Sequence, residues 1–591
     1  MIYIAEVETF IKAAQSEHPE MRGPWLAELE LKSQQGKTED LPDLIKSYFS
    51  KFGSKLVTYS DMTMYLSALD RETQKRIHAE LSSQYSAVEI SSVADICRDM
   101  ILVQLDRFCG NHQGLSEEES QTLVTDLLRR YESVQHLVEN MVSTDIRPSD
   151  EYLVLASHIL WTVWLETGLD KYFSQNISLL AWALTSSPAN WQVKLLMTRL
   201  LTSVGAAGAA YSVHAGLDIK HLMLDSLGWV LDHHLTFSGL TNLANQVQNQ
   251  TVKLYTQVSK DTADHIITAY RTGTFYQIRD IYNLRQRILS SYNLLTVDAE
   301  RQLSIILHET SSHSQTCDII SFLEPLADKE ELSWASKRDN RDLETMVSWD
   351  PPHCRIEDMR EKSLEAELLY GRTRQLVVKC VQAAVVASLT SQENDLNTEY
   401  LTSFSDKLQA HWKVCLEKSD YRPAVWLPQS PSYPDLAAYN KSYQIQSVTK
   451  CLEVVVSLLE GGEGPDIVKA RMASVGEAVG TSVSGLAENI EANGGSLLAR
   501  RELLQETVWL VETLGLTTAL SGVIFSIMRG GSGKGGKKAK KGKGLVLQQF
   551  LDFTGCYTKL TENLEQAIKT LERSINVRFF QLQGYILFPF F

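Results

Sequence analysis

Four glycines recur at a nearly constant interval between residues 150 and 295. They are Gly168, Gly205, Gly239 and Gly273, and successive members are 37, 34 and 34 positions apart. An apolar run that fits a helix precedes each glycine, and a second such run follows it, as in LTNLANQVQNQTVKLYTQV after Gly239. One helix–turn–helix unit cannot bury its apolar face alone, so we expect consecutive units to stack into a superhelix.

The glycines suit their places because the residue after a helix often takes a positive φ, which glycine adopts without steric cost. Ser187 and Pro188 close the helical run ALTSSP, as the tetratricopeptide pattern prefers. A period of about 34 residues is typical of tetratricopeptide repeats, although the full W-L-G-Y signature is absent. We therefore expect degenerate repeats, and an irregular helical bundle with coincidental glycines stays open as the alternative.

The rest of the chain is also helical in pattern, with apolar residues at i, i+3 and i+4. Upstream helices are expected over 41–52, 70–84 and 92–108. Downstream helices are expected over 362–390, 400–418, 441–461, 465–493, 498–528 and 545–580. No segment alternates like a strand beside hairpin residues, so the fold class is all-α, a tetratricopeptide-like helical-repeat superhelix (α-solenoid) with a C-terminal helical region.

These patterns divide the chain into regions. Residues 419–440 hold four of the 14 prolines and form the clearest loop. The terminal FFQLQGYILFPFF has neither a helical nor a strand pattern, and we expect 581–591 not to be a native terminus. The expected regions are a helical repeat region 1–145, the degenerate repeats 146–300, a helical region 301–418, the Pro-rich loop 419–440 and a C-terminal helical region 441–580.

A basic segment, residues 529–544 (RGGSGKGGKKAKKGKG), stands out from a chain whose formal net charge is −15. Gly531 followed by Gly536 and Lys537 matches the start of a phosphate-binding loop. That loop needs Ser or Thr next, to hold magnesium, and needs an α/β unit around it. Lys538 takes the hydroxyl position and the chain shows no parallel sheet, so the phosphate-loop interpretation fails.

The same segment is a candidate polyanion-binding arm. Lysines on a glycine-rich tether can neutralise phosphates without fixed geometry, and no aromatic residue lies among them to stack on bases. We expect either a sequence-independent, salt-sensitive contact with a nucleic-acid backbone, with no specific DNA binding, or a solvated loop between two helices. The candidate residues are Arg529, Lys534, Lys537, Lys538, Lys540, Lys541 and Lys543.

Other motifs resemble sites without completing them. His308 and His313 are five apart, so they diverge on a helix, whereas zinc-protease histidines at i and i+4 share a face. Cys109 and His112 are half of a zinc site. Arg107 to His112 approaches an acyl-CoA loop, with histidine where glycine or alanine is needed. His233 and His234 are adjacent and point different ways. We expect no catalytic, cofactor or metal residue here, as in a scaffold.

Three features of the sequence bear on the cellular compartment of the protein. The eight cysteines show no C-x-x-C, which is typical of a reducing compartment, so we expect a cytoplasmic protein. The N-terminal MIYIAEVETFIKAAQ carries acids where a signal peptide needs a basic region. Residues 513–528 lack charge but fall short of the roughly 20 residues of a membrane span, so we expect a buried helix and no membrane partner.

Several local strings occur in a fixed order along the chain. They are RGPWLAELEL at 22–31, YFSKFG at 48–53, LTSSPAN at 184–190 with KLL at 194–196, RDNRDL at 338–343 with SWDP at 348–351, and the lysine run at 537–543. From about Glu6 to Arg578, this ordered set resembles one family, the large auxiliary subunits of NatB N-terminal acetyltransferases. With this resemblance, the polyanion expected at the basic segment is the ribosome or rRNA.

The resemblance implies a tetratricopeptide-like superhelix that wraps a small catalytic subunit of GNAT fold and helps place it at the ribosome. It implies acetyl transfer from acetyl-CoA to nascent chains that begin Met-Asp, Met-Glu, Met-Asn or Met-Gln, with the catalytic and acetyl-CoA sites in that partner. Family members carry repeats ahead of the position of Met1, so we expect this chain to lack them.

The sequence does not identify the residues that contact the catalytic subunit. The alternative function is a helical-repeat adaptor that binds RNA or ribosomes through the lysine-rich segment without an acetyltransferase partner.

Overall fold

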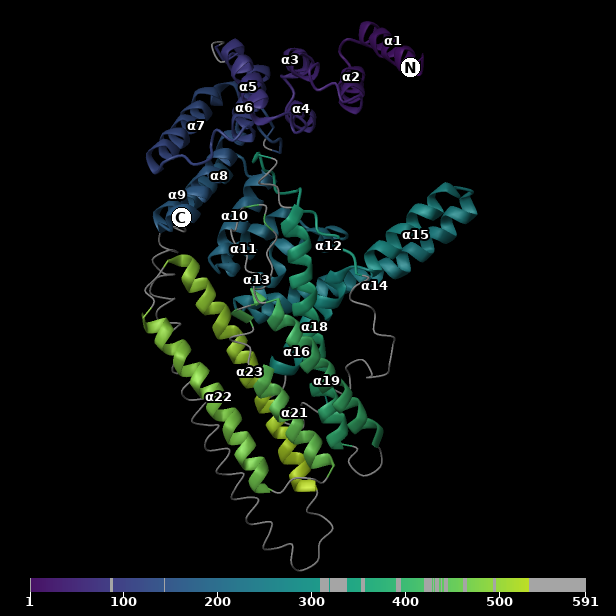
Figure 1. The fold of residues 1–591 in the computed structure, drawn as a ribbon, viewed down its shortest axis with the longest axis vertical. Coiled ribbons are helices and arrows are strands. Elements are labelled where there is room, and N and C mark those ends of the chain that lie inside the picture. Colours follow the sequence, from purple (N-terminus) through teal and green to yellow (C-terminus); the bar gives the residue numbers. More distant parts are fainter. Residues whose placement is uncertain are drawn as a thin grey trace, which may run out of the picture. The chain divides into compact units, whose positions relative to one another are not determined.

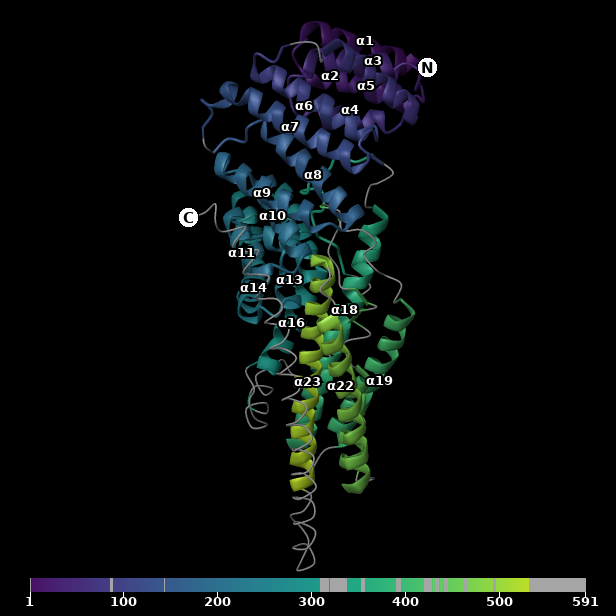
Figure 2. The same ribbon diagram turned by 90° about the vertical axis from the view of Figure 1, so that its left-hand side faces the viewer.

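A computed structural model of the chain describes residues 2–85, 89–142, 144–308, 337–351, 357–389, 395–418, 445–460, 465–492 and 496–530, with residue 318 and six positions between 428 and 439. These residues form helices joined by short turns, as Figures 1 and 2 show. Within these ranges there is no strand, and the β contact that occurs is an isolated bridge between Ser291 and Arg338. The all-α prediction is confirmed.

The chain divides into two compact units. The first consists of Met1–Met197, Glu344–Asp358 and Leu427–Gln429, and the second of the remaining segments. The helices of the first unit are α1 (Ile2–Glu17), α2 (Arg22–Gln34), α3 (Leu41–Phe52), α4 (Thr58–Leu66), α5 (Arg71–Tyr85), α6 (Val93–Phe108), α7 (Glu117–Val138), α8 (Asp150–Thr167) and α9 (Asp170–Ser186), and α10 (Trp191–Ser203) crosses into the second.

The first unit is built from amphipathic helices that pack in sequence order. Leu41, Ile45 and Phe49 recur at four-residue spacing along α3 and are fully buried in a cluster that α2 to α6 share. In contrast, α8 is apolar on nearly every face, because it packs against α6, α7 and α9 at once. The helices predicted over 41–52, 70–84 and 92–108 are confirmed as α3, α5 and α6.

The second unit has its core among long helices. Its elements are α11 (Ala207–His214), η1 (Ala215–Leu217), α12 (Met223–Leu227), η2 (Gly228–Val230), α13 (Asp232–Phe237), α14 (Thr241–Thr272), α15 (Tyr276–Leu289), α16 (Tyr292–His308), α18 (Glu357–Leu389), α19 (Asp395–Glu417), α21 (Ile445–Leu459), α22 (Pro465–Ala492) and α23 (Leu497–Gly530). The helices α21, α22 and α23 run side by side in both views (Figures 1 and 2).

One of these helices, α23, is long and apolar enough to cross a membrane when judged by length and composition alone. In the structure 53% of its apolar window is buried inside the protein. Leu514, Leu520 and Val523 belong to the core cluster formed with α18, α19, α21 and α22. The burial predicted for the uncharged run 513–528 is therefore confirmed for these side chains.

The glycine period marks helix ends, as predicted. Gly168, Gly205, Gly239 and Gly273 all have positive φ, between 66° and 78°. Gly168 directly follows α8 and Gly273 directly follows α14, each as a left-handed C-cap whose N–H bonds back to the last turn. The helix end predicted at Ser187 and Pro188 is also confirmed, because α9 ends at Ser186 with Ser187 as its C-cap.

The content of the intervals departs from the expected helix–turn–helix unit. Two helices, α9 and α10, fill the interval from Gly168 to Gly205, as predicted. The next interval is broken into short pieces, α11 to α13. The interval from Gly239 to Gly273 is one continuous helix, α14, of 32 residues. Residues 241–272 contain no Gly or Pro, so nothing in this stretch interrupts the hydrogen-bond ladder, and the prediction of a pair was wrong there.

Replacing Gly273 by alanine tests the backbone requirement. An added Cβ would meet no atom within 4 Å, but φ is +73°, so Gly273→Ala should destabilise the chain by about 1 kcal/mol through backbone strain alone. Gly476 in α22 also has open space around it and no positive φ, so Gly476→Ala should be stabilising by about 0.5–1 kcal/mol. Urea unfolding of both variants measures the difference, and equal shifts would contradict it.

Candidate functional site

A buried carboxylate, Asp225, anchors the segment 338–343 in the second unit. Asp225 Oδ1 accepts hydrogen bonds from Tyr255 Oη at 2.5 Å and Ser291 Oγ at 2.6 Å, and Oδ2 accepts one from Asn340 Nδ2 at 2.8 Å. The Asp225 residue is 3% exposed. Hydrogen bonds to a carboxylate are about twice as strong as neutral ones, so these contacts offset the loss of water around the charge. They join α12, α14 and the residue that precedes α16 to a segment far along the chain.

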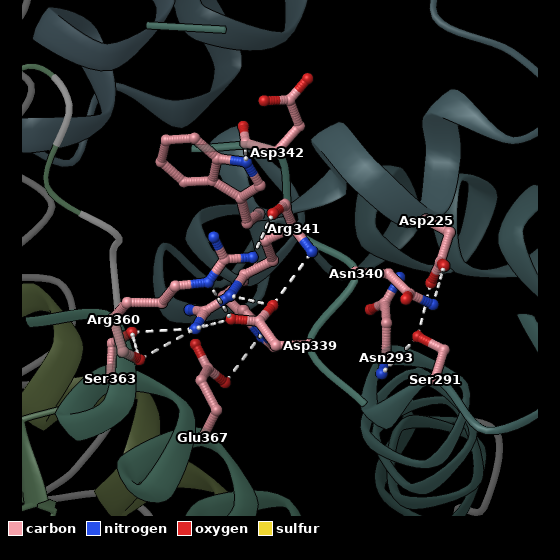
Figure 3. A network of polar contacts seen from close by, with 12 residues as sticks. Asp225, Ser291, Asn293, Asp339, Asn340, Arg341, Asp342, Arg360, Ser363 and Glu367 are labelled. Carbon is pink, nitrogen blue, oxygen red and sulfur yellow. Dashed lines mark hydrogen bonds and ion pairs between the residues drawn. The ribbon is translucent and has the colours of Figure 1, made fainter. Parts of the chain in front are cut away.

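Asn340 and its neighbours also pair with the junction between α15 and α16. Asn340 Nδ2 donates to the Arg287 carbonyl at 3.0 Å, and Arg287 Nε donates to Asn340 Oδ1 at 3.1 Å. The backbone adds two bonds, from Tyr292 N to Arg338 O at 3.2 Å and from Arg338 N to Ser290 O at 2.9 Å. The segment is thus held by side chain and main chain together (Figure 3).

Arg341 makes the most heavily bonded contact of the segment. Its Nε and Nη2 donate to the two Asp339 oxygens at 3.0 Å each, and Nη2 also donates to Ser363 Oγ at 2.9 Å. The guanidinium lies 5.4 Å from the centre of the Tyr292 ring. Burial opposes the charge, but Tyr292 and Asp339 outweigh it and hold the pKa of Arg341 above its ordinary value. Figure 3 shows these groups converging at the start of α18.

The segment ends with two further bonds to η2 and α12. Trp229 Nε1 donates to the Asp342 carbonyl at 3.2 Å, and Asp342 N donates to Ser226 O at 2.9 Å. The charged side chains Asp225, Asp339 and Arg341 have protein partners and are largely buried. Such a network can fix the arrangement of helices, and we infer that its role is positioning rather than chemistry on a substrate.

The string SWDP, further along, has a similar role in the first unit. Trp349 is 2% exposed, and its ring centre lies 5.5 Å from that of His158 in α8. Asp350 Oδ1 accepts from Arg107 Nε at 2.9 Å and pairs with Arg107 Nη2 at 2.8 Å. Burial, with a smaller effect from Arg107, lowers the pKa of His158 to about 3, so it is neutral in the folded chain.

A second buried ion cluster joins α16, α18 and α23. Arg374 donates to Glu300 Oε2 at 2.8 Å and to the two Glu512 oxygens at 2.7 and 2.9 Å, and its guanidinium lies 5.2 Å from the Tyr370 ring centre. Burial opposes its charge, but the two carboxylates raise the pKa of Arg374 well above its ordinary value. Removing one member of such a buried cluster leaves an uncompensated charge.

The adjacent histidines lie in different environments. His233 Nε2 lies 3.1 Å from Glu367 Oε2, and both side chains are buried. Burial favours the neutral ring, but Glu367, with Glu300 and Asp232 behind it, raises the pKa of His233 to about 9. Burial and the nearby Arg199 instead push the pKa of His234 well below its ordinary value. The two rings therefore do not form a shared metal site.

The CGNH string is also used within the protein. Burial, helped by Asp106, raises the pKa of Cys109 to about 12, so its thiol is not a ready nucleophile. His112 Nε2 lies 3.0 Å from Asp106 Oδ2. Across the described ranges no three His, Cys, Asp or Glu side chains are grouped to hold a metal. His308 ends α16, while 309–313 lie outside the described residues.

The predicted polyanion site is almost entirely outside the described residues. Arg529 lies in the last turn of α23, and this helix ends at Gly530, two residues beyond the expected end at Met528. Lys534, Lys537, Lys538, Lys540, Lys541 and Lys543 lie beyond the described ranges, as do the helix expected over 545–580 and the tail 581–591. The basic segment and the region boundaries stay predictions.

Sequence reasoning missed the two buried ion networks. The segment RDNRDL was noted as a family string, without a role for its charges. A signal was present for Arg374, which lies in the mostly apolar run LLYGRTRQLVVKCVQAAVV beside Arg372 and Lys379. A charge on the buried face of a helix requires a partner, but the sequence does not say that Glu300 and Glu512 supply it.

The helices and their buried anchors define an all-α protein of the helical-repeat class. The model of one family, described as the N-acetyltransferase B complex (NatB) non catalytic subunit, matches residues 3–343, and that of a Psidin-like C-terminal domain matches 347–578. The chain therefore belongs to the family of NatB non-catalytic subunits, which confirms the resemblance.

Comparisons with individual proteins agree with this family assignment. The chain is 26% identical to the rat N-alpha-acetyltransferase 25, NatB auxiliary subunit, over 561 residues, covering 88% of this chain and 58% of that protein. It is 31% identical to the human counterpart over 378 residues, covering 61% and 39%. A structure titled "The NatB Acetyltransferase Complex Bound To CoA and MES" matches with a TM-score of 0.50 at 13% identity, covering 97% of this chain and 71% of that one. That likeness supports the fold, and the chain spans little more than half of the rat protein.

The His233–Glu367 pair predicts a pH dependence of stability. Because the folded pKa of His233, about 9, exceeds the ordinary value of about 6.5, the pair is fully stabilising below pH 6.5 and loses its effect as pH rises to 9. His233→Gln should therefore cost about 3 kcal/mol of unfolding free energy at pH 6 and little at pH 9.5.

Urea unfolding at the two pH values measures this difference. His265→Gln, at an exposed position of α14, serves as the control and should change stability little at either pH. A loss of the same size at both pH values in His233→Gln would mean that the ring acts through packing rather than charge.

Proposed function

We propose that the chain is the scaffold of a NatB-type N-terminal acetyltransferase, which binds and positions a separate catalytic subunit of GNAT fold. The observation that carries this is the match of the non-catalytic-subunit family over residues 3–343. The burial of titratable side chains in the described ranges supports the proposal. Cys109, His158 and His233 are buried and contribute to the packing of the helices.

The finer parts of the proposal rest on the family resemblance. The catalytic partner binds acetyl-CoA and transfers the acetyl group to nascent chains that begin Met-Asp, Met-Glu, Met-Asn or Met-Gln. The chain works in the cytoplasm and places the partner at the ribosome. The basic segment 529–544 supplies the electrostatic contact with rRNA, because it concentrates positive charge on an acidic chain.

Co-expression with the catalytic subunit of the same organism tests the scaffold role. We expect the two proteins to co-elute from a sizing column, and the complex to acetylate a Met-Glu peptide and not a peptide that begins with Ser. The chain alone should show no turnover with acetyl-CoA. Elution of the chain apart from the catalytic subunit would contradict the proposal, and RNA binding without an acetyltransferase partner would favour the adaptor function.

Ribosome co-sedimentation tests the basic segment separately. Replacing Lys537, Lys538, Lys540, Lys541 and Lys543 by serine should reduce co-sedimentation, and the parent should lose binding steeply between about 50 and 200 mM salt. The matched control replaces the same lysines by arginine, which keeps the charge and should keep the binding. Unchanged binding of the serine variant at low salt would remove this part of the proposal.

A further inference from the structure

The end of the α14–α15 hairpin exposes aromatic side chains that a folded protein usually buries. Tyr270 is 70% exposed, Tyr276 is 74% exposed, and Phe275 and Tyr282 are each more than half exposed. These four rings lie within the thirteen residues 270–282, which include the turn at Gly273. Exposed apolar side chains that gather in this way, rather than singly, mark an interaction surface.

The base of the same hairpin is packed in the ordinary way. Leu254, Tyr255 and Val258 of α14 form a buried cluster with Ile288 of α15. Figure 1 shows the hairpin leaving α16 at this base and extending away from the other helices of the second unit. Beyond the base, α14 and α15 pack on each other, and the rings at the turn face outward. The exposure therefore belongs to the hairpin end alone.

The charge of this end is opposite to that of the chain. From His265 to Leu289 there are four arginines and one aspartate, Asp280, whereas the whole chain carries −15. Arg287 is held at the base by Asn340, and Arg285 Nη2 donates to Ser259 Oγ at 3.3 Å. Arg271 and Arg279 are exposed close to the turn.

We propose that the hairpin end binds a single-stranded segment of RNA. Unpaired bases stack on the rings of Tyr270, Phe275 and Tyr276, since aromatic faces accept any base. Arg271 and Arg279 pair with the phosphates, and a planar guanidinium can also stack on a base. The rings of Tyr270 and Phe275 meet edge to face, 5.6 Å apart, so this contact takes up at most one face of one ring and leaves each ring a face for stacking.

The alternation of charge and rings favours RNA over a protein partner. The centre of a protein–protein interface is depleted of charge, which gathers at its rim. Here Arg279 lies one helical turn from both Tyr276 and Tyr282 on α15, so charge lies within the aromatic patch. The surface differs from the basic segment 529–544, which holds no aromatic residue, and the inference does not depend on the presence of a catalytic subunit.

Fluorescence anisotropy of the full chain with a labelled, unstructured RNA of about a dozen nucleotides tests the proposal. Measurements are made in the lysine-to-serine background, so that the basic segment contributes nothing. Tyr270→Ala with Tyr276→Ala should weaken binding by roughly tenfold per ring. Replacing both by phenylalanine should retain binding, because the stacking faces stay.

Matched controls keep the test specific. Phe10→Ala removes a ring that is also 74% exposed but lies in α1, and it should leave the affinity unchanged. Arg271→Gln with Arg279→Gln should weaken binding and flatten its salt dependence. A duplex of the same sequence should bind more weakly than the single strand, since its bases are already stacked.

Three results would overturn the proposal. The first is unchanged affinity of the double alanine variant, and the second is equal binding of duplex and single strand. The third is no RNA binding at about 50 mM salt by the lysine-to-serine chain with an unchanged hairpin end. Displacement of the RNA by poly-glutamate at the same total charge would also contradict the proposal, because the hairpin end would then recognise negative charge alone or an acidic protein. Far-ultraviolet circular dichroism verifies that each variant is folded, which the exposure of the replaced side chains leads us to expect.

Discussion

Buried carboxylates paired with donors far away in sequence hold the second unit together. Asp225 accepts a hydrogen bond from Asn340, which lies 115 positions later, and Glu512 accepts one from Arg374, which lies 138 positions earlier. A charge removed from water is costly unless its partners are well placed, so each pair tolerates few arrangements of the surrounding helices. Apolar packing brings these helices together, and the buried polar pairs restrict how the helices can be arranged. The segment 338–343 therefore joins helices that lie far apart in the sequence.

This explains why particular strings mark the family in this chain. RDNRDL and SWDP are polar, and a reader of the sequence would place them on the surface. In the structure Asn340, Arg341 and Trp349 are each less than a tenth exposed. Polar side chains that must be both buried and paired have few substitutes, whereas a leucine in a core can be exchanged for another apolar residue. The resemblance noted from sequence therefore rested partly on residues whose roles only the structure reveals.

The helices themselves were largely predictable, because apolar spacing and breakers are local features. Gly168 and Gly273 marked helix ends, and Leu41, Ile45 and Phe49 marked the face of α3. The single helix between Gly239 and Gly273 was missed, since the repeat period was given more weight than the absence of any breaker. The pairing of Arg374 with Glu300 and Glu512 was beyond reach, because it depends on three helices meeting. The exposure of Tyr270 and Tyr276 was equally hidden, since the spacing of aromatic residues does not show which faces are left uncovered.

The Arg374 cluster also has a consequence for the order of events during synthesis. Arg374 lies 74 residues after Glu300 and 138 residues before Glu512. A growing chain emerges at about 5–20 residues per second, so α18 waits on the order of ten seconds or more for its second carboxylate. During that interval the site holds one cation against one anion, and its burial is incomplete. The Arg374 cluster of the second unit therefore closes late, after α23 has been made. Chaperones that shield apolar helices would act on the part of the chain that is made before α23.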